Sequence, residues 1–140
     1  MQASGTFTVT AFQPSTIESD TTIATALPTG IAIMQKQYTG GVTGRSSTVF
    51  VSAFDQDRGF GSYVALESFE GSLNGVAGTF NYIHSAATRG SDRYQEHFTV
   101  VPESGTAGLH GITGVGRIAV GADGGHEIVF EYDIPAEKSR

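Results

Sequence analysis

The chain has 140 residues with 19 glycines, no cysteine and no tryptophan, and its formal net charge at pH 7 is -6. Domains of about 100–150 residues are the most common, so this length predicts a single domain over residues 1–140. The lack of cysteine excludes a disulfide scaffold, a thiol nucleophile and a thiolate metal site. Only 8 lysines and arginines stand against 14 acids, which argues against nucleic acid, because such a partner needs a basic face.

The sequence predicts no targeting or membrane segment. Residues 1–5 contain no basic region and no apolar stretch of signal-peptide length. No apolar run approaches the ~20 residues that span a bilayer as a helix. We therefore expect a cytoplasmic protein without a membrane partner.

Apolar and polar residues alternate with period two through most of the chain, which is typical of β-strands. In the first segment Phe7, Val9 and Ala11 alternate with threonines. Turn residues such as Asn74-Gly75 separate the segments, and none has a helical stripe of useful length. The predicted strands are 5–13, 31–39, 45–54, 62–70, 75–85, 92–101, 109–120 and 126–134.

Residues 14–30 break this spacing. Prolines, serines and threonines make the segment loop-like, and it is too long for a hairpin turn. Ile17, Ile23 and Leu27 could fold it over one end of the protein as a lid. A mobile surface excursion is the alternative.

Eight consecutive strands with short connections predict an all-β, up-and-down antiparallel fold. An open sheet would leave two exposed edges, whereas closure into an eight-stranded barrel removes them. Eight strands enclose enough room for side chains or one small ligand. Glycines within the strand patterns, including Gly78, Gly114 and Gly116, allow the bends that closure requires. A β-sandwich is the main competing architecture.

Several motifs occur in an order that resembles a known family. They are Lys36-Gln37-Tyr38-Thr39-Gly40, Tyr63-Val64-Ala65-Leu66-Glu67, Gly71-Ser72-Leu73-Asn74-Gly75, residues 78–84, residues 100–109 and residues 126–132. This order resembles the bacterial domain-of-unknown-function family 3224. The resemblance implies a closed, allene oxide cyclase-like (calycin-like) β-barrel. That family has no settled activity, but related barrels include cyclases that fold a reactive polyene or epoxide without a cofactor.

The hairpin of residues 75–101 supplies most of the candidate site. With a turn centred near Arg89, it pairs His84 with Tyr94, Tyr82 with Glu96, and Phe80 with Phe98. The opposite face is more polar, so we expect these six residues to point inward. In the last strand Phe130 and Tyr132 share an inward parity with His126.

Up-and-down topology places His84, Tyr94 and His126 at one end of the predicted barrel, next to the long loop. Tyr82 and Glu96 lie one layer deeper. The predicted ligand-binding residues are Tyr82, Tyr94, Phe80, Phe98, His126, Phe130 and Tyr132. Apolar walls with a few polar groups are typical of a small-molecule site.

Three residues are candidate catalytic groups: Glu96, Glu67 and His84. An inward carboxylate is rarely buried alone, so Glu96 either pairs with a histidine or tyrosine or has a raised pKa suited to acid-base work. The strand that carries Glu67 has two partly apolar faces and cannot be oriented, and a pair with Arg45 or Lys36 is the alternative to a catalytic role. The 4 histidines lack metal-ligand spacing, so we expect no metal.

Three function classes remain open. The preferred prediction is binding of a small, largely apolar molecule inside the barrel. The second is a cofactor-free isomerase or cyclase acting on a polyene or epoxide-like substrate. The third is a non-catalytic homo-oligomer in which outward residues such as Val49, Val51 or Val115 form a contiguous apolar patch.

Overall fold

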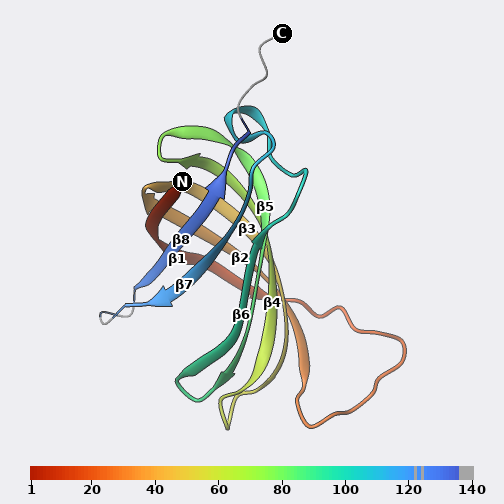
Figure 1. The fold of residues 1–140 in the computed structure, drawn as a ribbon. Coiled ribbons are helices and arrows are strands. Elements are labelled where there is room, and N and C mark those ends of the chain that lie inside the picture. The colour runs from red at the N-terminus through yellow and green to blue at the C-terminus, as the bar shows by residue number, and fades with distance from the viewer. Residues whose placement is uncertain (122, 124, 136–140) are drawn as a thin grey trace.

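A computed structural model describes residues 1–121, 123 and 125–135 (Figure 1). They form eight strands and one short 3-10 helix, and the predicted all-β composition is confirmed. The elements are β1 (Gln2–Pro14), β2 (Thr29–Gly40), β3 (Val42–Asp55), β4 (Phe60–Leu73), β5 (Val76–Arg89), β6 (Asp92–Val100), η1 (Ala107–Leu109), β7 (Thr113–Val120) and β8 (His126–Asp133). No helix among these residues is long and apolar enough to cross a membrane.

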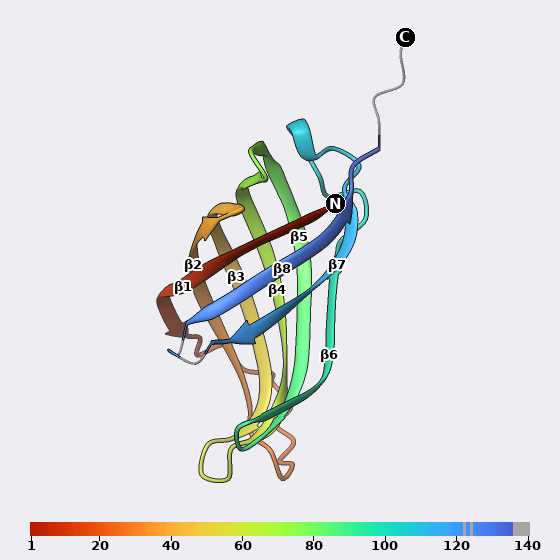
Figure 2. The same ribbon diagram turned by 60° about the vertical axis from the view of Figure 1, so that its left-hand side comes forward.

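The eight strands are antiparallel and form a ring. Each strand pairs with its neighbour in sequence, and β1 pairs with β8 through Gln2 opposite Glu131 to Phe7 opposite His126. Figure 2 shows β1, β8 and β7 crossing in front of β3, β4 and β5. Side chains of alternate residues therefore point into the ring, as the period-two pattern requires.

One predicted strand begins too early. Residues 109–112 were expected to open the seventh strand, but η1 ends at Leu109 and β7 starts only at Thr113. Leu109 and Ile112 are both fully buried. Residues three apart lie on the same side of a helical turn, so Leu109 and Ile112 can both point inward there. In a strand the same two side chains would point in opposite directions. This segment covers one end of the ring.

The hydrophobic core fills that covered end. Phe69, Phe80 and Phe130 pack there, with ring centroids 5.0 Å apart for the first pair and 5.6 Å for Phe80 and Phe130. Leu73 and Leu109 are fully buried against them. Inward-facing residues of β4, β5 and β8, together with Leu109 of η1, therefore fill this half with apolar side chains.

A row of glycines bends the sheet. Gly44, Gly71 and Gly78 lie opposite one another across β3, β4 and β5. A side chain on Gly71 would collide with the carbonyl oxygen of Thr43, and Gly44 has a φ of +140°, which few other residues adopt. The strands approach and curve closely at this row, as expected for glycine in a bent sheet.

The ring is weakest between β6 and β7. Only Thr99 and Val115 pair along this seam, whereas β5 and β6 pair from Tyr82 to Arg89. The N-terminal part of β6, from Asp92 to the residues before Thr99, runs alongside β5 and does not pair with β7 (Figure 2). The ring therefore has a closed half and an open half, and the open half is a curved sheet with one concave face.

The predicted β5–β6 register is wrong. His84 lies opposite Phe98 and not Tyr94, and Tyr82 lies opposite Val100 and not Glu96. The turn sits beyond Arg89, which pairs with Asp92, and a bulge between Ser85 and Ala87 shifts the register again. Gln95 adopts a φ of +52° in the bulge, a conformation that the alternation pattern does not reveal.

The loop of residues 15–28 is irregular, as expected, and extends away from the strands in Figure 1. Ile17 and Ile23 are 77% and 79% exposed. The loop does not pack over the end of the ring in this conformation, and its role as a lid stays a prediction.

Candidate functional site

A polar network is buried in the middle of the ring, between the apolar core and the open half. Glu67, on β4, is fully buried and lies 2.6 Å from the ammonium group of Lys36, on β2. Ser46 and Thr48, on β3, donate hydrogen bonds to its other oxygen. The strand register brings these side chains to Glu67, because Thr48 lies directly opposite it across β3 and β4. Glu67 therefore pairs with Lys36, which was one of the two partners expected as the alternative to a catalytic role. The other expected partner, Arg45, pairs with Glu70 at the surface.

Two tyrosines extend this network toward the core. The hydroxyls of Tyr38 and Tyr82 lie 2.6 Å apart, and Tyr38 also bonds Ser46 at 2.8 Å. Burial is the largest cause that raises the pKa of both hydroxyls, and the charge of Glu67 adds to it. Both tyrosines are therefore neutral at pH 7. Since no buried side-chain nitrogen or oxygen of the described residues lacks a partner, the network is complete and rigid.

The second polar group joins β5 to β6. Nε2 of His84 lies 2.8 Å from Oε2 of Glu96. The His84 side chain is only 4% exposed, whereas that of Glu96 is 27% exposed. Glu96 thus pairs with a histidine, which is one of the two alternatives expected for it. Both residues border the open half of the ring.

The pKa of His84 is lowered from its ordinary value of 6.5, chiefly because burial disfavours the charged ring. Arg93 and Lys36 lower this pKa further, and the hydrogen bond and charge of Glu96 oppose the change. His84 is therefore a neutral imidazole at pH 7 whose Nε2 faces a carboxylate.

Glu96 and Arg93 also close the seam that the backbone leaves open. Oε2 of Glu96 accepts a hydrogen bond from the backbone nitrogen of Ile118 at 3.3 Å, and Arg93 donates to the carbonyl oxygen of Ile118 at 2.9 Å. Two β6 side chains thus replace the missing ladder bonds to β7. The arrangement gives Glu96 a structural function in addition to its contact with His84.

Aromatic rings form a stripe across the concave face of the open half, which we call the aromatic stripe: Phe12, Phe50 and Tyr63. Phe50 and Tyr63 stack at 5.3 Å, and Phe12 meets Phe50 at 6.3 Å. The edge of the His84 ring continues the stripe, 5.5 Å from Tyr63. Phe12 is 56% exposed and the other two are partly exposed, so the stripe is accessible from outside.

The other predicted ligand-binding residues divide into two groups. Five of them are buried in the ring: Tyr82, Phe80, Phe98, Phe130 and Tyr132. His126 is half-buried and stacks on Phe7 at 4.9 Å. Tyr94 was expected inside but is 43% exposed, because the register shift places it opposite Ala87 near the tip of the hairpin.

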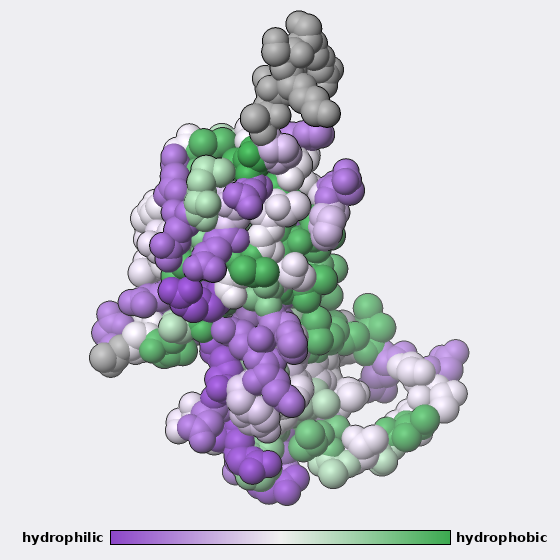
Figure 3. Space-filling model, viewed as in Figure 1, coloured by the Kyte–Doolittle hydropathy of each residue, from purple (hydrophilic) through white to green (hydrophobic). Residues whose placement is uncertain are grey.

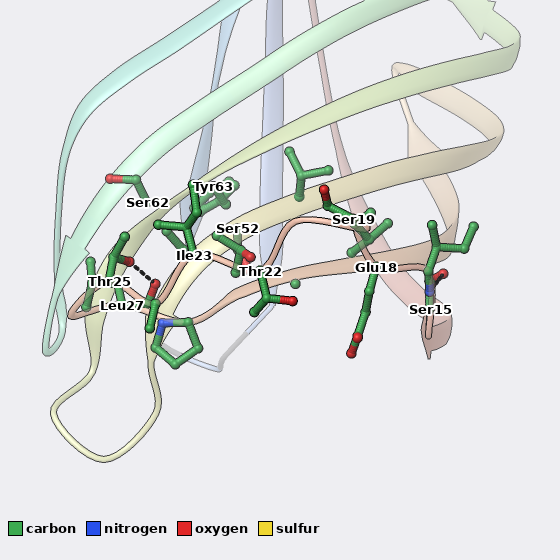
Figure 4. Close-up of a pocket in the computed structure, with 18 of the residues that line it drawn as sticks. Ser15, Glu18, Ser19, Thr22, Ile23, Thr25, Leu27, Ser52, Ser62 and Tyr63 are labelled. Carbon is green, nitrogen blue, oxygen red and sulfur yellow. Dashed lines mark hydrogen bonds between the residues drawn. The ribbon is translucent and has the colours of Figure 1, made fainter.

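A pocket of about 900 Å³ opens between the long loop and the ends of β3 and β4 (Figure 4). Ile23 and Leu27 line it from the loop, and Val51, Tyr63 and Val64 line it from the strands. Val51 and Val64 point outward, so this pocket lies mainly against the outer face of the sheet, and Tyr63 is the residue of the aromatic stripe that borders it.

The described residues offer no group of three or more histidines, aspartates and glutamates that could hold a metal ion. His97, on β6, and His110, in the turn after η1, are both exposed and lie in different parts of the chain.

Comparison with known proteins identifies the family. The model of the family described as "Protein of unknown function (DUF3224)" matches residues 3–132. The chain belongs to the DUF3224 family. The resemblance seen in the sequence motifs is confirmed.

A crystal structure of a DUF3224 protein of unknown function from Shewanella oneidensis MR-1 has a similar fold. It is 27% identical, the match covers 96% of this chain and 97% of that one, and the TM-score is 0.83. No curated protein matches the chain.

In this DUF3224 chain, sequence reasoning missed the aromatic stripe. Simple alternation puts Ala11 on the same face as Phe7, but a bulge between Val9 and Ala11 turns Phe12 inward, opposite Met34. Phe50 and Tyr63 share parity with Thr48 and Glu67, so orienting β4 through a buried Lys36–Glu67 pair would have placed both rings inside.

Proposed function

We propose that the chain binds a small, largely apolar molecule in the open half of the ring, against the aromatic stripe. The ring then acts as a closed, allene oxide cyclase-like barrel with one accessible end. The single observation that carries this proposal is the exposure of Phe12, Phe50 and Tyr63 on a concave, inward face. Aromatic rings on such a face are otherwise buried by packing, and apolar walls with few polar groups are typical of ligand sites.

The closed half supports this location. The phenylalanine core and the Lys36–Glu67 network fill the ring below Tyr82 with side chains that bond one another. A ligand therefore lies above the network, against the aromatic stripe and His84. In this proposal the loop of residues 15–28 closes over the bound molecule through Ile17, Ile23 and Leu27.

A titration with 2-methoxynaphthalene tests the proposal. The chain has no tryptophan, so the emission of this probe is easily followed. We expect saturable binding by the native protein and roughly tenfold weaker binding by Phe50→Ala, since one stacked ring contributes about 1 kcal/mol beyond its area. Leu66→Ala, an outward position on β4, is the matched control and should bind like the native chain. Absence of saturable binding by the native protein, or equal loss in both variants, would overturn the proposal.

An isomerase or cyclase is the catalytic form of the same proposal. Glu67 has no part in it, because both of its oxygens are already bonded to Lys36, Ser46 and Thr48. The neutral His84, oriented by Glu96, is the acid-base group beside the aromatic stripe. Turnover of a polyene epoxide should fall at least 100-fold in Glu96→Gln but not in Glu127→Gln, which points outward. Equal rates in these two variants would remove the pair from the mechanism.

One observation favours a second candidate function, self-association. Outward apolar residues lie opposite one another across three strands: Ile33, Val49 and Leu66 in one row, and Ile31, Val51 and Val64 in the next. Five of these six are 39–47% exposed. We call these six residues the outer patch, and Figure 3 shows apolar side chains gathered on the side that faces the loop. Val115, expected in the same patch, lies apart on β7.

We propose a second copy of the chain as the occupant of the outer patch. The six residues carry no charge, whereas the chain as a whole has a net charge of -6. Two copies therefore repel one another least when neutral faces meet, and an apolar face is complementary to itself in a two-fold dimer. Sedimentation should show a dimer that Leu66→Lys dissociates and Val115→Lys leaves intact. A native monomer, or a dimer that survives Leu66→Lys, would contradict this proposal.

A further inference from the structure

We infer that the molecule held in the open half carries a neutral aromatic hydroxyl, which donates a hydrogen bond to Nδ1 of His84. The inference rests on the proposed function and names the chemical class of its ligand. Four features of His84 lead to it: the partner of Nε2, the charge of the ring, the exposure of Nδ1 and the surfaces around it.

Glu96 determines which nitrogen of His84 holds the proton. Oε2 of Glu96 lies 2.8 Å from Nε2 and also accepts the backbone N–H of Ile118. An ionised carboxylate only accepts hydrogen bonds, so Nε2 must be the donor. In a neutral imidazole the other nitrogen, Nδ1, then presents a lone pair.

The imidazole is neutral at neutral pH. Burial holds its pKa below 6.5, and the positive charges of Arg93 and Lys36 act in the same direction. Glu96 is the one group facing it that opposes the change. Nδ1 is therefore a hydrogen-bond acceptor under ordinary conditions.

Nδ1, the second nitrogen of the His84 ring, is unpaired among the described residues. No hydrogen bond of the described residues engages it, yet none of their buried side-chain nitrogens lacks a partner. Nδ1 is therefore not completely buried, although the His84 side chain is only 4% exposed. His84 points inward from β5 between Tyr63 and Phe98, at ring distances of 5.5 Å and 5.7 Å, so its ring borders the aromatic stripe.

The groups around Nδ1 indicate the charge and the ring system of the ligand. A carboxylate would bring its lone pairs against the lone pair of Nδ1, whereas a neutral hydroxyl donates a hydrogen bond to it. Phe50 and Tyr63 are stacked at an interplanar angle of 22° and offer flat faces to an aromatic ring. A neutral hydroxyaromatic satisfies both the acceptor and the stripe.

Two probes that share one ring system test this inference. We expect 2-naphthol to bind the native protein about five- to tenfold more tightly than 2-methoxynaphthalene, which has no donor, because one neutral hydrogen bond contributes about 1 kcal/mol. In His84→Leu this preference should vanish while 2-methoxynaphthalene still binds. His97→Leu, on the outward face of β6, is the matched control and should keep the preference. Equal affinity of the native protein for both probes would overturn the inference and leave the proposed function standing, whereas failure of both to bind would overturn the proposed function itself.

A measurement on the native protein covers the case in which His84→Leu fails to fold. Nitrogen-15 spectra of the imidazole should show the proton on Nε2, and the Nδ1 resonance should move when 2-naphthol is added. A proton found on Nδ1, or an Nδ1 resonance unchanged at saturation with 2-naphthol, would contradict the assignment.

Discussion

Glu67 shows how one residue is tied to its surroundings. Its carboxylate is fully buried and bonded to Lys36, Ser46 and Thr48, so its negative charge is compensated locally. Lys36 is held on its other side by the ring of Phe7, 4.8 Å from the ring centroid. Removing one charge leaves the other buried without compensation, which is more costly than the loss of an ordinary contact.

We therefore predict that Glu67→Gln lowers the free energy of unfolding by about 3–5 kcal/mol. Urea denaturation at pH 7 measures this. Glu70→Gln removes the partner of Arg45, and because that pair is exposed the loss there should stay below about 1 kcal/mol. Similar losses in the two variants would mean that the buried pair is not compensated as described.

A second prediction at this scale concerns pH. Burial lowers the pKa of His84 and of His126 below their ordinary value of 6.5, so the unfolded chain binds protons more readily than the folded one. Stability is then fully present above pH 6.5 and is lost as the pH falls from there through the lowered pKa of the folded state, with a slope of at most about 1.4 kcal/mol per pH unit for His84 and a smaller one for His126, which is more exposed to solvent.

Urea midpoints between pH 8 and pH 5 measure this loss. The double variant His84→Asn/His126→Asn should lose the dependence, while His97→Asn, at an exposed position, should retain it. Stability that rises on acidification would contradict the direction of both pKa changes.

Among the elements, β6 depends most on its side chains. Arg93 and Glu96 bond the backbone of Ile118 where β6 and β7 no longer pair, and the Gln95 bulge brings both side chains to the seam. Bulges beside functional sites commonly redirect side chains in this way. Glu96 therefore has two contacts at once, one to β7 at the seam and one to His84.

We predict that Arg93→Ala loosens β7 without unfolding the ring. Amide hydrogens of Arg117 to Ala119 should exchange at least tenfold faster, because one of the two side-chain bonds to Ile118 is lost. Arg117→Ala removes an exposed arginine on β7 itself and should leave these rates unchanged. Unchanged exchange in Arg93→Ala would show that the seam does not depend on that bond.

Residue patterns predict the strands better than they predict the pairing between them. Alternation and turn residues such as Asn74-Gly75 place all eight strands, because burial of one face imposes period two. The bulges at Gln95 and near Thr10 could not be predicted, because each inserts one residue without a special sequence. The turn, which lies beyond Arg89, accounts for the wrong position of Tyr94, and the bulge near Thr10 accounts for the omission of Phe12 from the expected site.

At the scale of the whole molecule, the two halves of the ring differ in what their inner faces hold. The closed half holds the apolar core and the buried network, while the open half presents the aromatic stripe. Composition and motifs indicate a ring of strands and its family, but they do not show where the ring opens. That opening depends on β6 continuing past its single pair with β7, a long-range feature.

The long loop belongs to the open half, and its role in binding is a prediction for the whole molecule. Replacing residues 16–26 with a short Gly-Ser linker should change the free energy of unfolding by less than about 1 kcal/mol, because Ile17 and Ile23 are exposed and loop length has a small effect. Binding of 2-methoxynaphthalene should weaken at least fivefold if the loop closes over the ligand. Unchanged affinity would exclude a lid, and a large loss of stability would show that the loop is part of the folded body.

The pairing of β1 with β8 also bears on how the chain folds. Seven of the eight contacts between neighbouring strands join segments that follow one another in sequence, whereas Gln2 meets Glu131 only after nearly the whole chain has been brought round. Closing so long a loop loses much chain entropy before any contact compensates for it. Successive hairpins should therefore form first and the two ends should meet last, with folding in the slow range of milliseconds to seconds that is common for β-proteins rich in non-local contacts.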